Sequence, residues 1–342
     1  MSRIRLSVGG KVGAGPCYPV ATDESSGSDL LTERRIVTEP QGRKVLVTGA
    51  RGFVGRSVSR ALAERGWEVH GLVTAEPTRP GETAIWHTGD LLAAGTAEAI
   101  VEALGPSHLV HLAWAPNRGV YESLDNFQWV EASLELLRAF AAGGGSRAVF
   151  VGSCAEYEWG SDEPLAEDAP LAYGNAYAAA KTSLGQLFRD YCSLAGFSGA
   201  WARPFFLFGP AEPRQRLVAS VVTALLAGEP APCSHGEQIR DYLYVRDAAD
   251  ALAALLDSEL QGAVNVASGE GTRLKDLVTE IARRLQGEEL LQLGAIPAPE
   301  DEPPRVVAAI DRLRDELGWR PAYDLEEAID ETITWWARRM TH

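Results

Sequence analysis

Cysteine is scarce in this chain of 342 residues, and its pattern argues against two kinds of stabilised scaffold. No two cysteines form a C-x-x-C pair, and the four lie far apart, at Cys17, Cys154, Cys192 and Cys233. This spacing favours neither a zinc site nor a disulfide framework. We therefore expect no bound metal, and a reducing, cytoplasmic setting.

Positive charge and long apolar runs are also in short supply. The chain has 32 Lys and Arg against 47 Asp and Glu, which gives a formal net charge of −15. Nucleic acid and anionic membrane surfaces would on average repel such a protein, so neither is an expected partner. No apolar run approaches the roughly 20 residues of a membrane-spanning helix. A phosphate-bearing ligand would have to be small and held by local cations.

The first part of the chain shows no sustained hydrophobic period. Residues 1–42 are rich in Gly and Ser, and glycines stand where a secretion signal has its apolar core. We predict a mobile N-terminal extension there. From residue 43, apolar runs alternate with helical periods. The predicted strands cover 44–48, 67–74, 108–113, 148–152 and 199–206, and the predicted helices 53–65, 96–104, 124–142 and 177–194.

This alternation predicts an α/β fold with a doubly wound parallel sheet of the Rossmann type. Prolines clustered after residue 209 break the regularity and indicate a smaller, irregular C-terminal substrate domain, with helices at 246–257, 272–286 and 325–339. We expect a dinucleotide-binding domain over 43–210 to which 245–270 returns. The substrate domain then consists of 211–244 and 271–342.

Three glycines stand at the junction of the first strand and the first helix, at Gly49, Gly52 and Gly55. A tight turn, close approach of the backbone to a pyrophosphate, and close helix packing each require a missing side chain at such a junction. The backbone N–H groups from Phe53 onward would face the anion. The glycines and their flanking elements together predict a dinucleotide site.

Tyr177 and Lys181 are four residues apart, so both side chains lie on one face of the predicted helix. A phenol with a pKa of about 10 is a poor proton carrier at neutral pH, but a neighbouring ammonium lowers that value. Ser153 follows the strand 148–152 at the carboxyl edge of the sheet, where ligands bind in doubly wound folds. Its hydroxyl can donate a hydrogen bond to a reacting oxygen.

These features resemble the extended short-chain dehydrogenase/reductase family, in its NAD-dependent epimerase/dehydratase branch, over nearly all of 44–342. The T-G-x-x-G-x-x-G spacing at 48–55 and the Ser153, Tyr177 and Lys181 set carry the resemblance, and His111-Leu-Ala-Trp114 is similar to the family's H-L-A-A. The resemblance implies that Ser153, Tyr177 and Lys181 are catalytic. It implies cofactor contacts for Gly49, Arg51, Gly52, Phe53, Val54, Gly55, Asp90, Leu91, Leu112, Ala113 and Lys181.

The choice of cofactor depends on the end of the second strand. An NAD enzyme usually has an acidic residue there to bind the ribose 2′-hydroxyl, but Gly71-Leu-Val-Thr74 has none. Arg51 in the glycine loop is a cation that can meet a 2′-phosphate. We therefore expect NADP(H), with NAD(H) and a merely solvated Arg51 as the alternative.

Two further segments resemble parts of the family that bind nucleotide sugars. Residues 201–210 are similar to L-R-x-F-N-V-Y-G-P, and residues 238–245 are similar to R-D-Y-I-H-V. The second similarity implies that Arg240 binds the diphosphate of a nucleotide-diphosphate sugar. Arg216 is either a second cation of that site or an exposed charge.

The chain also departs from the family pattern. Trp129 stands where the family has a catalytic Asn, and Asn126, one turn earlier, either substitutes for it or solvates the helix face. Cys154-Ala155 replaces the Asp-Glu pair that 4,6-dehydratases use to eliminate water, so we do not expect that reaction. Phe206 replaces the Asn of many epimerases, which makes the chain look closer to 4-keto-6-deoxysugar reductases.

We accordingly expect an NADPH-dependent ketoreductase that acts on a nucleotide-linked keto-deoxysugar, at the C4 ketone, with Tyr177 as the proton donor. The alternative is a nucleotide-sugar 4-epimerase that retains NAD(P), and a more distant one is a non-catalytic dinucleotide sensor. Relatives pair two helices across a two-fold axis, so the helices 124–142 and 177–194 imply a homodimer.

Overall fold

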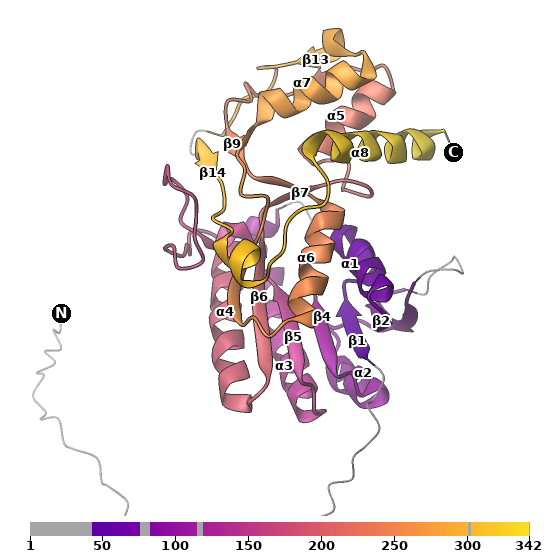
Figure 1. Ribbon diagram of the computed structural model, residues 1–342, viewed down its shortest axis with the longest axis vertical. Helices are drawn as coiled ribbons and strands as arrows, with labels where there is room; N and C mark the ends of the chain where they lie inside the picture. Colours follow the sequence, from indigo (N-terminus) through magenta and orange to yellow (C-terminus); the bar gives the residue numbers. More distant parts are fainter. Residues whose placement is uncertain (1–42, 76–82, 115–118, 300–301, 342) are drawn as a thin grey trace, which may run out of the picture. The chain divides into compact units, whose positions relative to one another are not determined.

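The computed structural model describes residues 43–75, 83–114, 119–299 and 302–341, so the predicted extension at 1–42 lies outside the described residues. Its main feature is a seven-stranded sheet in the order β11-β6-β5-β4-β1-β2-β3 (Figure 1). Every neighbouring pair in this sheet is parallel, which confirms the doubly wound fold. The strands are β1 (Lys44–Thr48), β2 (Glu68–Val73), β3 (Ile85–Thr88), β4 (His108–His111), β5 (Arg147–Val151), β6 (Ser198–Pro204) and β11 (Gly262–Val266).

Alternate residues of the central strands pack into two separate hydrophobic cores, one on each face of the sheet. Val45 and Val47 of β1 pack with helices α1 (Phe53–Glu64) and α6 (Val245–Asp257) on one face of the sheet. Leu46 packs on the other face with α2 (Thr96–Leu104), α3 (Asp125–Ala142) and α4 (Ala176–Ala195). Both faces are therefore covered, which explains why consecutive residues in the middle of β1, Val45, Leu46 and Val47, are all apolar.

The helices predicted from the sequence are found within one or two residues of their predicted bounds, whereas one strand of the large sheet was not predicted and one predicted strand ends early. The edge strand β3 was not predicted because it is short and only half-buried. The strand predicted at 199–206 ends at Pro204. Phe206 begins a new strand, β7 (Phe206–Phe208), which pairs with β10 (Tyr242–Tyr244) outside the large sheet.

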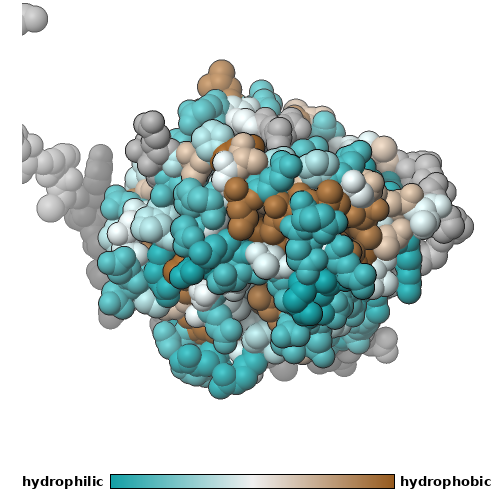
Figure 2. All heavy atoms as spheres, turned by 90° about the horizontal axis from the view of Figure 1, so that it is seen from above, coloured by the Kyte–Doolittle hydropathy of each residue, from teal (hydrophilic) through white to brown (hydrophobic). Residues whose placement is uncertain are grey.

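A second group of helices packs beyond the carboxyl edge of the large sheet, around a core of its own. It consists of α5 (Leu217–Leu226), α7 (Leu274–Leu285) and α8 (Leu325–Met340), and Trp336 of α8 is buried in this core. Figure 2 looks onto this end of the molecule and shows mostly hydrophilic residues with one hydrophobic band. The remaining short elements are β8 (Ala231–Pro232), β9 (Ile239–Arg240), β12 (Thr272–Arg273), β13 (Leu291–Gln292), β14 (Arg305–Val306), and the turns η1 (Val120–Glu122), η2 (Cys154–Glu156), η3 (Glu288–Leu290) and η4 (Arg312–Glu316).

Three of the four cysteines lie in the described residues, and Cys154, Cys192 and Cys233 are all buried free thiols. Among the described side chains, no group of three His, Cys, Asp or Glu is placed to hold a metal ion. No helix in the described ranges is both long and apolar enough to cross a membrane.

Candidate active site

A crevice opens where the strand order reverses, between the carboxyl ends of β1 and β4. Ligands bind at this switch point in doubly wound sheets. The crevice holds a cavity of about 450 Å³. It brings together seven of the residues predicted to contact the cofactor, namely Gly49, Arg51, Gly52, Asp90, Leu91, Leu112 and Ala113.

The glycines have the geometry that a bound pyrophosphate requires. Gly49 has a φ of +66°, and a Cβ there would lie 2.8 Å from the backbone nitrogen of Ala113. A Cβ on Gly55 would lie 2.1 Å from the Gly49 carbonyl oxygen, so helix α1 could not pack this close to the loop with any other residue. No side chain caps α1 at Gly52, which leaves the N–H groups of its first turn, from Phe53 and Val54 on, for an anion. The loop fits a dinucleotide.

A buried hydrogen-bonded chain fixes the strand ends on both sides of the crevice. Ser133 Oγ donates to the Trp129 carbonyl, so it accepts from His111 Nε2 at 2.9 Å. His111 Nδ1 then accepts from Thr48 Oγ1 at 2.7 Å, and Thr48 Oγ1 accepts from the N–H groups of Leu112 and Ala113. Burial, with help from the Lys181 charge, lowers the pKa of His111 to about 3, so the ring stays neutral.

Two arginines line the crevice near the end of β2. Arg51 is the one predicted from the sequence, and Arg56, in the first turn of α1, is an addition; its Nε donates to the Arg51 carbonyl at 2.7 Å. Asp90 also lines the crevice, and its Oδ1 accepts from the Leu92 N–H at 3.0 Å. Asp90 therefore stabilises its own turn as well as facing the cavity.

Tyr177 and Lys181 project from the first two turns of α4, and their placement is set by the N-cap of that helix. Asn175 Oδ1 accepts from the Ala178 N–H at 2.9 Å, and this N-cap starts the helix at Ala176, one residue before Tyr177. Lys181 is buried, and its Nζ donates to the Val151 carbonyl at 2.8 Å. Ser153, two residues beyond Val151, is the N-cap of η2. The three predicted catalytic residues thus meet at the carboxyl end of β5.

The ionisation of the pair differs from the sequence argument. Burial raises the pKa of the Tyr177 phenol, and hydrogen bonding by Ser153 opposes the shift. Burial lowers the pKa of the Lys181 ammonium to about 7, and the Glu156 charge opposes that shift. The expected lowering of the Tyr177 pKa by Lys181 is not found, because the ammonium is directed to the Val151 carbonyl and the Trp114 ring.

A buried carboxylate that the sequence argument overlooked lies beneath Ser153. Glu156 has no exposed surface, and its Oε1 accepts from the Ser153 N–H at 2.8 Å. Its carboxylate also accepts from Trp201 Nε1 and forms an ion pair with Arg203 Nε at 2.8 Å. Arg203 in turn donates to the Tyr157 hydroxyl at 3.0 Å. This network holds the turn on which Ser153 sits.

Neither expected role for Asn126 is found. Asn126 is fully buried, and its Nδ2 donates to the carbonyls of Val120 and Ser123. Its Oδ1 accepts from Trp114 Nε1 at 2.9 Å. Structural contacts therefore take both amide hydrogens and one lone pair of the oxygen, and the buried side chain solvates no helix face.

A second pocket, of about 520 Å³, contains Arg240 and Phe206. Arg240 is not the free cation that the family motif implies, since its guanidinium pairs with Glu302 at 2.8 Å. Most of the other walls are apolar or aromatic, with Tyr121 and Trp159 among them. Arg216 is exposed at the N-cap of α5 and lines neither this pocket nor the crevice.

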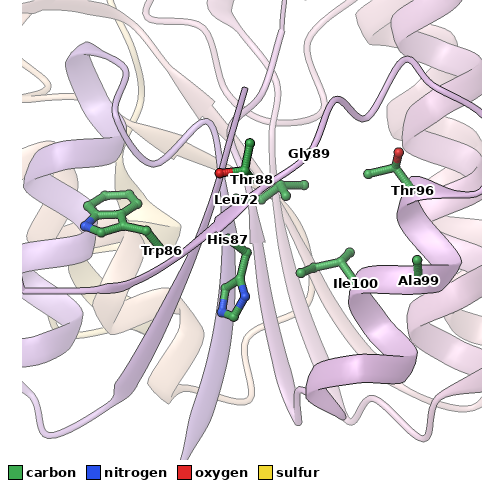
Figure 3. Close-up of a pocket in the computed structure, with 8 residues that line it drawn as sticks. All are labelled: Leu72, Trp86, His87, Thr88, Gly89, Thr96, Ala99 and Ile100. Atoms are coloured by element: carbon green, nitrogen blue, oxygen red, sulfur yellow. The ribbon is translucent and has the colours of Figure 1, made fainter. Parts of the chain in front are cut away.

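A third hollow lies along the edge strand β3. Figure 3 shows its walls, with Trp86, His87 and Thr88 on β3 and with Thr96, Ala99 and Ile100 on α2. It shares only Leu72 and Gly89 with the cofactor crevice. It contains none of the residues predicted for the site, so the candidate site comprises the crevice and the Arg240 pocket.

Comparison with known proteins supplies the family. A family model described as NAD dependent epimerase/dehydratase matches residues 45–267. The chain belongs to this family. A UDP-glucose 4-epimerase of Azospirillum brasilense is 29% identical over 327 residues, which are 87% of this chain and 92% of the relative.

Solved structures of the family share the fold. UDP-glucose 4-epimerase from Thermotoga maritima, solved with UDP-glucose, superposes with a TM-score of 0.80 at 21% identity, over 87% of this chain and 100% of that one. The Thermus thermophilus UDP-glucose 4-epimerase, solved with NAD, has a TM-score of 0.77 at 25% identity, over 86% and 98%. The predicted resemblance to the epimerase/dehydratase branch is thereby confirmed.

Some site residues carried a signal that sequence reasoning did not use. Arg56 lies in the first turn of α1, and first-turn side chains beside a glycine loop commonly face the bound anion. Glu156 follows Ser153 by three residues, the spacing of a capping box. Glu302 had no such local signal, because its partner Arg240 is 62 residues away in the chain.

Proposed function

We propose that the protein is a nucleotide-sugar 4-epimerase that keeps its nicotinamide cofactor bound through turnover. The sequence motifs favour a ketoreductase, with the epimerase as the alternative. The relatives support the alternative, since five curated proteins at 26–29% identity are named UDP-glucose 4-epimerase. None of the comparisons favours the ketoreductase.

The observation that carries the proposal is the position of Tyr177 between the two cavities. Its ring makes an edge contact with Trp114, which lines the crevice, and another with Tyr121, which lines the Arg240 pocket; the ring centres are 6.4 and 5.6 Å apart. A sugar held in the pocket would therefore reach a cofactor in the crevice past the Tyr177 hydroxyl. A bound nicotinamide ring would supply reversible hydride transfer.

The chain's own residues have complementary roles in this proposal. Tyr177 would take the proton of the sugar hydroxyl as the phenolate and return it as the phenol. Because burial raises the pKa of this phenol, the phenolate would depend on the positive charges of Lys181 and of an oxidised nicotinamide ring bound beside it. Ser153 would donate a hydrogen bond to the reacting oxygen of the sugar. Next to Ser153, burial raises the pKa of the Cys154 thiol to about 12, and Ala155 has no acidic group. The site thus has no second acid and base at that position, which favours epimerisation over elimination of water.

The cofactor we propose is NADP(H) or NAD(H), with a preference for the phosphorylated form. Arg51 and Arg56 both line the crevice, and no acidic side chain ends β2. We expect the double variant Arg51→Ala, Arg56→Ala to bind NADP⁺ at least about tenfold more weakly, because charge-assisted bonds to phosphate are strong. NAD⁺ affinity should change little. Equal loss for both dinucleotides, measured by calorimetry, would refute the preference.

Two structural expectations accompany this function. We propose that Arg240 meets the diphosphate of the substrate by exchanging its Glu302 partner for a phosphate, whereas the exposed Arg216 lines neither cavity and is left as a surface charge. The segments 211–244 and 271–342 then form the substrate half. We also propose a homodimer through α3 and α4, whose Phe127, Leu187 and Leu194 are exposed apolar side chains.

The test is turnover with very little cofactor. UDP-glucose, incubated with the enzyme and dinucleotide far below the sugar concentration, should convert to an equilibrium mixture with its C4 epimer. One reduced cofactor consumed for each molecule of a keto sugar would establish the ketoreductase instead.

A further inference from the structure

Two departures from the family pattern come together in space. Trp114 stands where the family's H-L-A-A has its last alanine, and Trp129 stands where the family has a catalytic Asn. In the structure both indoles line the cofactor crevice, and their rings stack with centres 6.2 Å apart at 28°. Two positions that are small or polar in relatives therefore form one aromatic wall in this chain.

Trp114 is held in a single orientation. Its Nε1 donates to Asn126 Oδ1 at 2.9 Å, and Asn126 is itself anchored to the carbonyls of Val120 and Ser123. With its polar edge fixed in this way, the indole presents its face to Lys181, whose Nζ lies 3.6 Å from the ring centre. The same indole makes the edge contact with Tyr177.

The ammonium of Lys181 has few other partners among the described residues. It has three N–H donors, and the Val151 carbonyl takes one of them. The indole face stabilises the remaining positive charge through a cation–π contact, which is stronger when the cation is desolvated, as it is at this buried position. Trp114 thus fixes both the direction and the environment of the ammonium.

We propose that Trp114, backed by Trp129, is a positioning residue that forms the wall against which the catalytic end of the dinucleotide lies and that holds the Lys181 ammonium at that end. The inference rests on the cofactor role proposed above. The crevice runs from Asp90 and Arg51, beside β2, to the two tryptophans, beside Lys181. The nicotinamide end must lie at the tryptophan end for Tyr177 and Lys181 to act on it.

Tryptophan emission tests the proposal without any turnover. NAD⁺ or NADP⁺ does not absorb where tryptophan emits, so it cannot quench a distant indole by energy transfer, and a stacked nicotinamide quenches the indole that it contacts. We expect saturating dinucleotide to quench wild-type emission, Trp114→Phe to lose most of the quench, and Trp129→Phe to lose part of it. Trp335→Phe, on α8, is the matched control and should quench like the wild type. Titration calorimetry on each variant establishes that the dinucleotide is saturating. The melting temperature of each variant without ligand establishes that it folds.

The affinity gives a second readout. Removing the wall with Trp114→Ala should weaken dinucleotide binding at least about tenfold, since a buried indole offers a large contact area. Undiminished quenching in Trp114→Phe would overturn the proposal, and so would a wild type that binds dinucleotide without quenching. If Trp114→Phe does not fold, full quenching in Trp129→Phe overturns it. Because no sugar is present, these outcomes are independent of whether the enzyme proves to be an epimerase or a reductase.

Discussion

At the scale of single residues, the charge of the Lys181 ammonium changes within the neutral pH range. The residue is 4% exposed, and burial lowers the pKa of its ammonium to about 7. The charge is therefore present below pH 7 and is lost as the pH rises through this value. In the unfolded chain the ammonium keeps its proton up to about pH 10.4, so between these values a rise in pH favours the folded state.

Activity that needs the Lys181 ammonium should accordingly fall above about pH 7. We expect a descending limb near this pH in the profile of turnover against pH. The guanidinium of Lys181→Arg keeps its charge throughout this range, so the descending limb should disappear from the profile of this variant. Its activity should be lower than that of the wild type, because a guanidinium fits the Val151 carbonyl and the Trp114 face differently. An unchanged limb in Lys181→Arg would assign the titration to another group.

Tyr177 carries the second prediction at this scale. Removing its hydroxyl with Tyr177→Phe should reduce turnover by about 10²- to 10⁴-fold, the usual contribution of a general acid or base. Dinucleotide affinity should be preserved, because the phenyl ring keeps its contacts with Trp114 and Tyr121. Tyr173→Phe, four residues earlier and 63% exposed, is the matched control. Steady-state rates of both variants decide whether the hydroxyl does the chemistry.

At the scale of elements, the turn η2 depends on a buried ion pair. Glu156 connects this turn to β6 through Arg203 and Trp201, and none of its surface is exposed. Glu156→Gln leaves the Arg203 charge without its partner, so we expect a loss of about 3–5 kcal/mol in the free energy of unfolding. Glu158→Gln, two residues away and exposed, should change stability by less than about 0.5 kcal/mol. Urea unfolding of the two variants makes the comparison; similar values would show that the network contributes little.

Elements whose limits are set locally were predictable from the sequence. Helix α2 has the predicted bounds because Gly95 and Gly105 flank it, both in the left-handed conformation that other residues avoid. The glycine loop was predictable for the same reason. Strand β3 was not, because an edge strand of four half-exposed residues has no apolar run to mark it.

Contacts between distant parts of the chain set the limit on predicting the site. Motifs predicted the catalytic residues Ser153, Tyr177 and Lys181. They could not predict the direction of the Lys181 side chain, because it depends on Trp114, which lies 67 residues earlier in the chain. The motif around Arg240 likewise predicted a cation without a protein partner. The ion pair with Glu302 could not be predicted, because the segment that contains Glu302 has no motif of its own.

At the scale of the whole molecule, this acidic protein concentrates cations at the two cavities where the anionic cofactor and substrate are proposed to bind. The formal charge is −15, yet Arg51 and Arg56 line the crevice and Arg240 lines the second pocket. Screening acts over about 8 Å at physiological salt, so these local charges dominate the field that a bound phosphate feels. The two cavities meet at Tyr177, and this arrangement is the basis of the proposed hydride transfer in both directions.

The fate of the hydrogen on the sugar carbon tests that arrangement most directly. Tyr177 is placed to exchange only the hydroxyl proton with solvent, so the carbon-bound hydrogen should leave and return without dilution. We predict that epimerisation of a nucleotide sugar in D₂O yields a product with no deuterium at C4 by NMR. Deuterium at that carbon would show proton abstraction from carbon and would contradict the account.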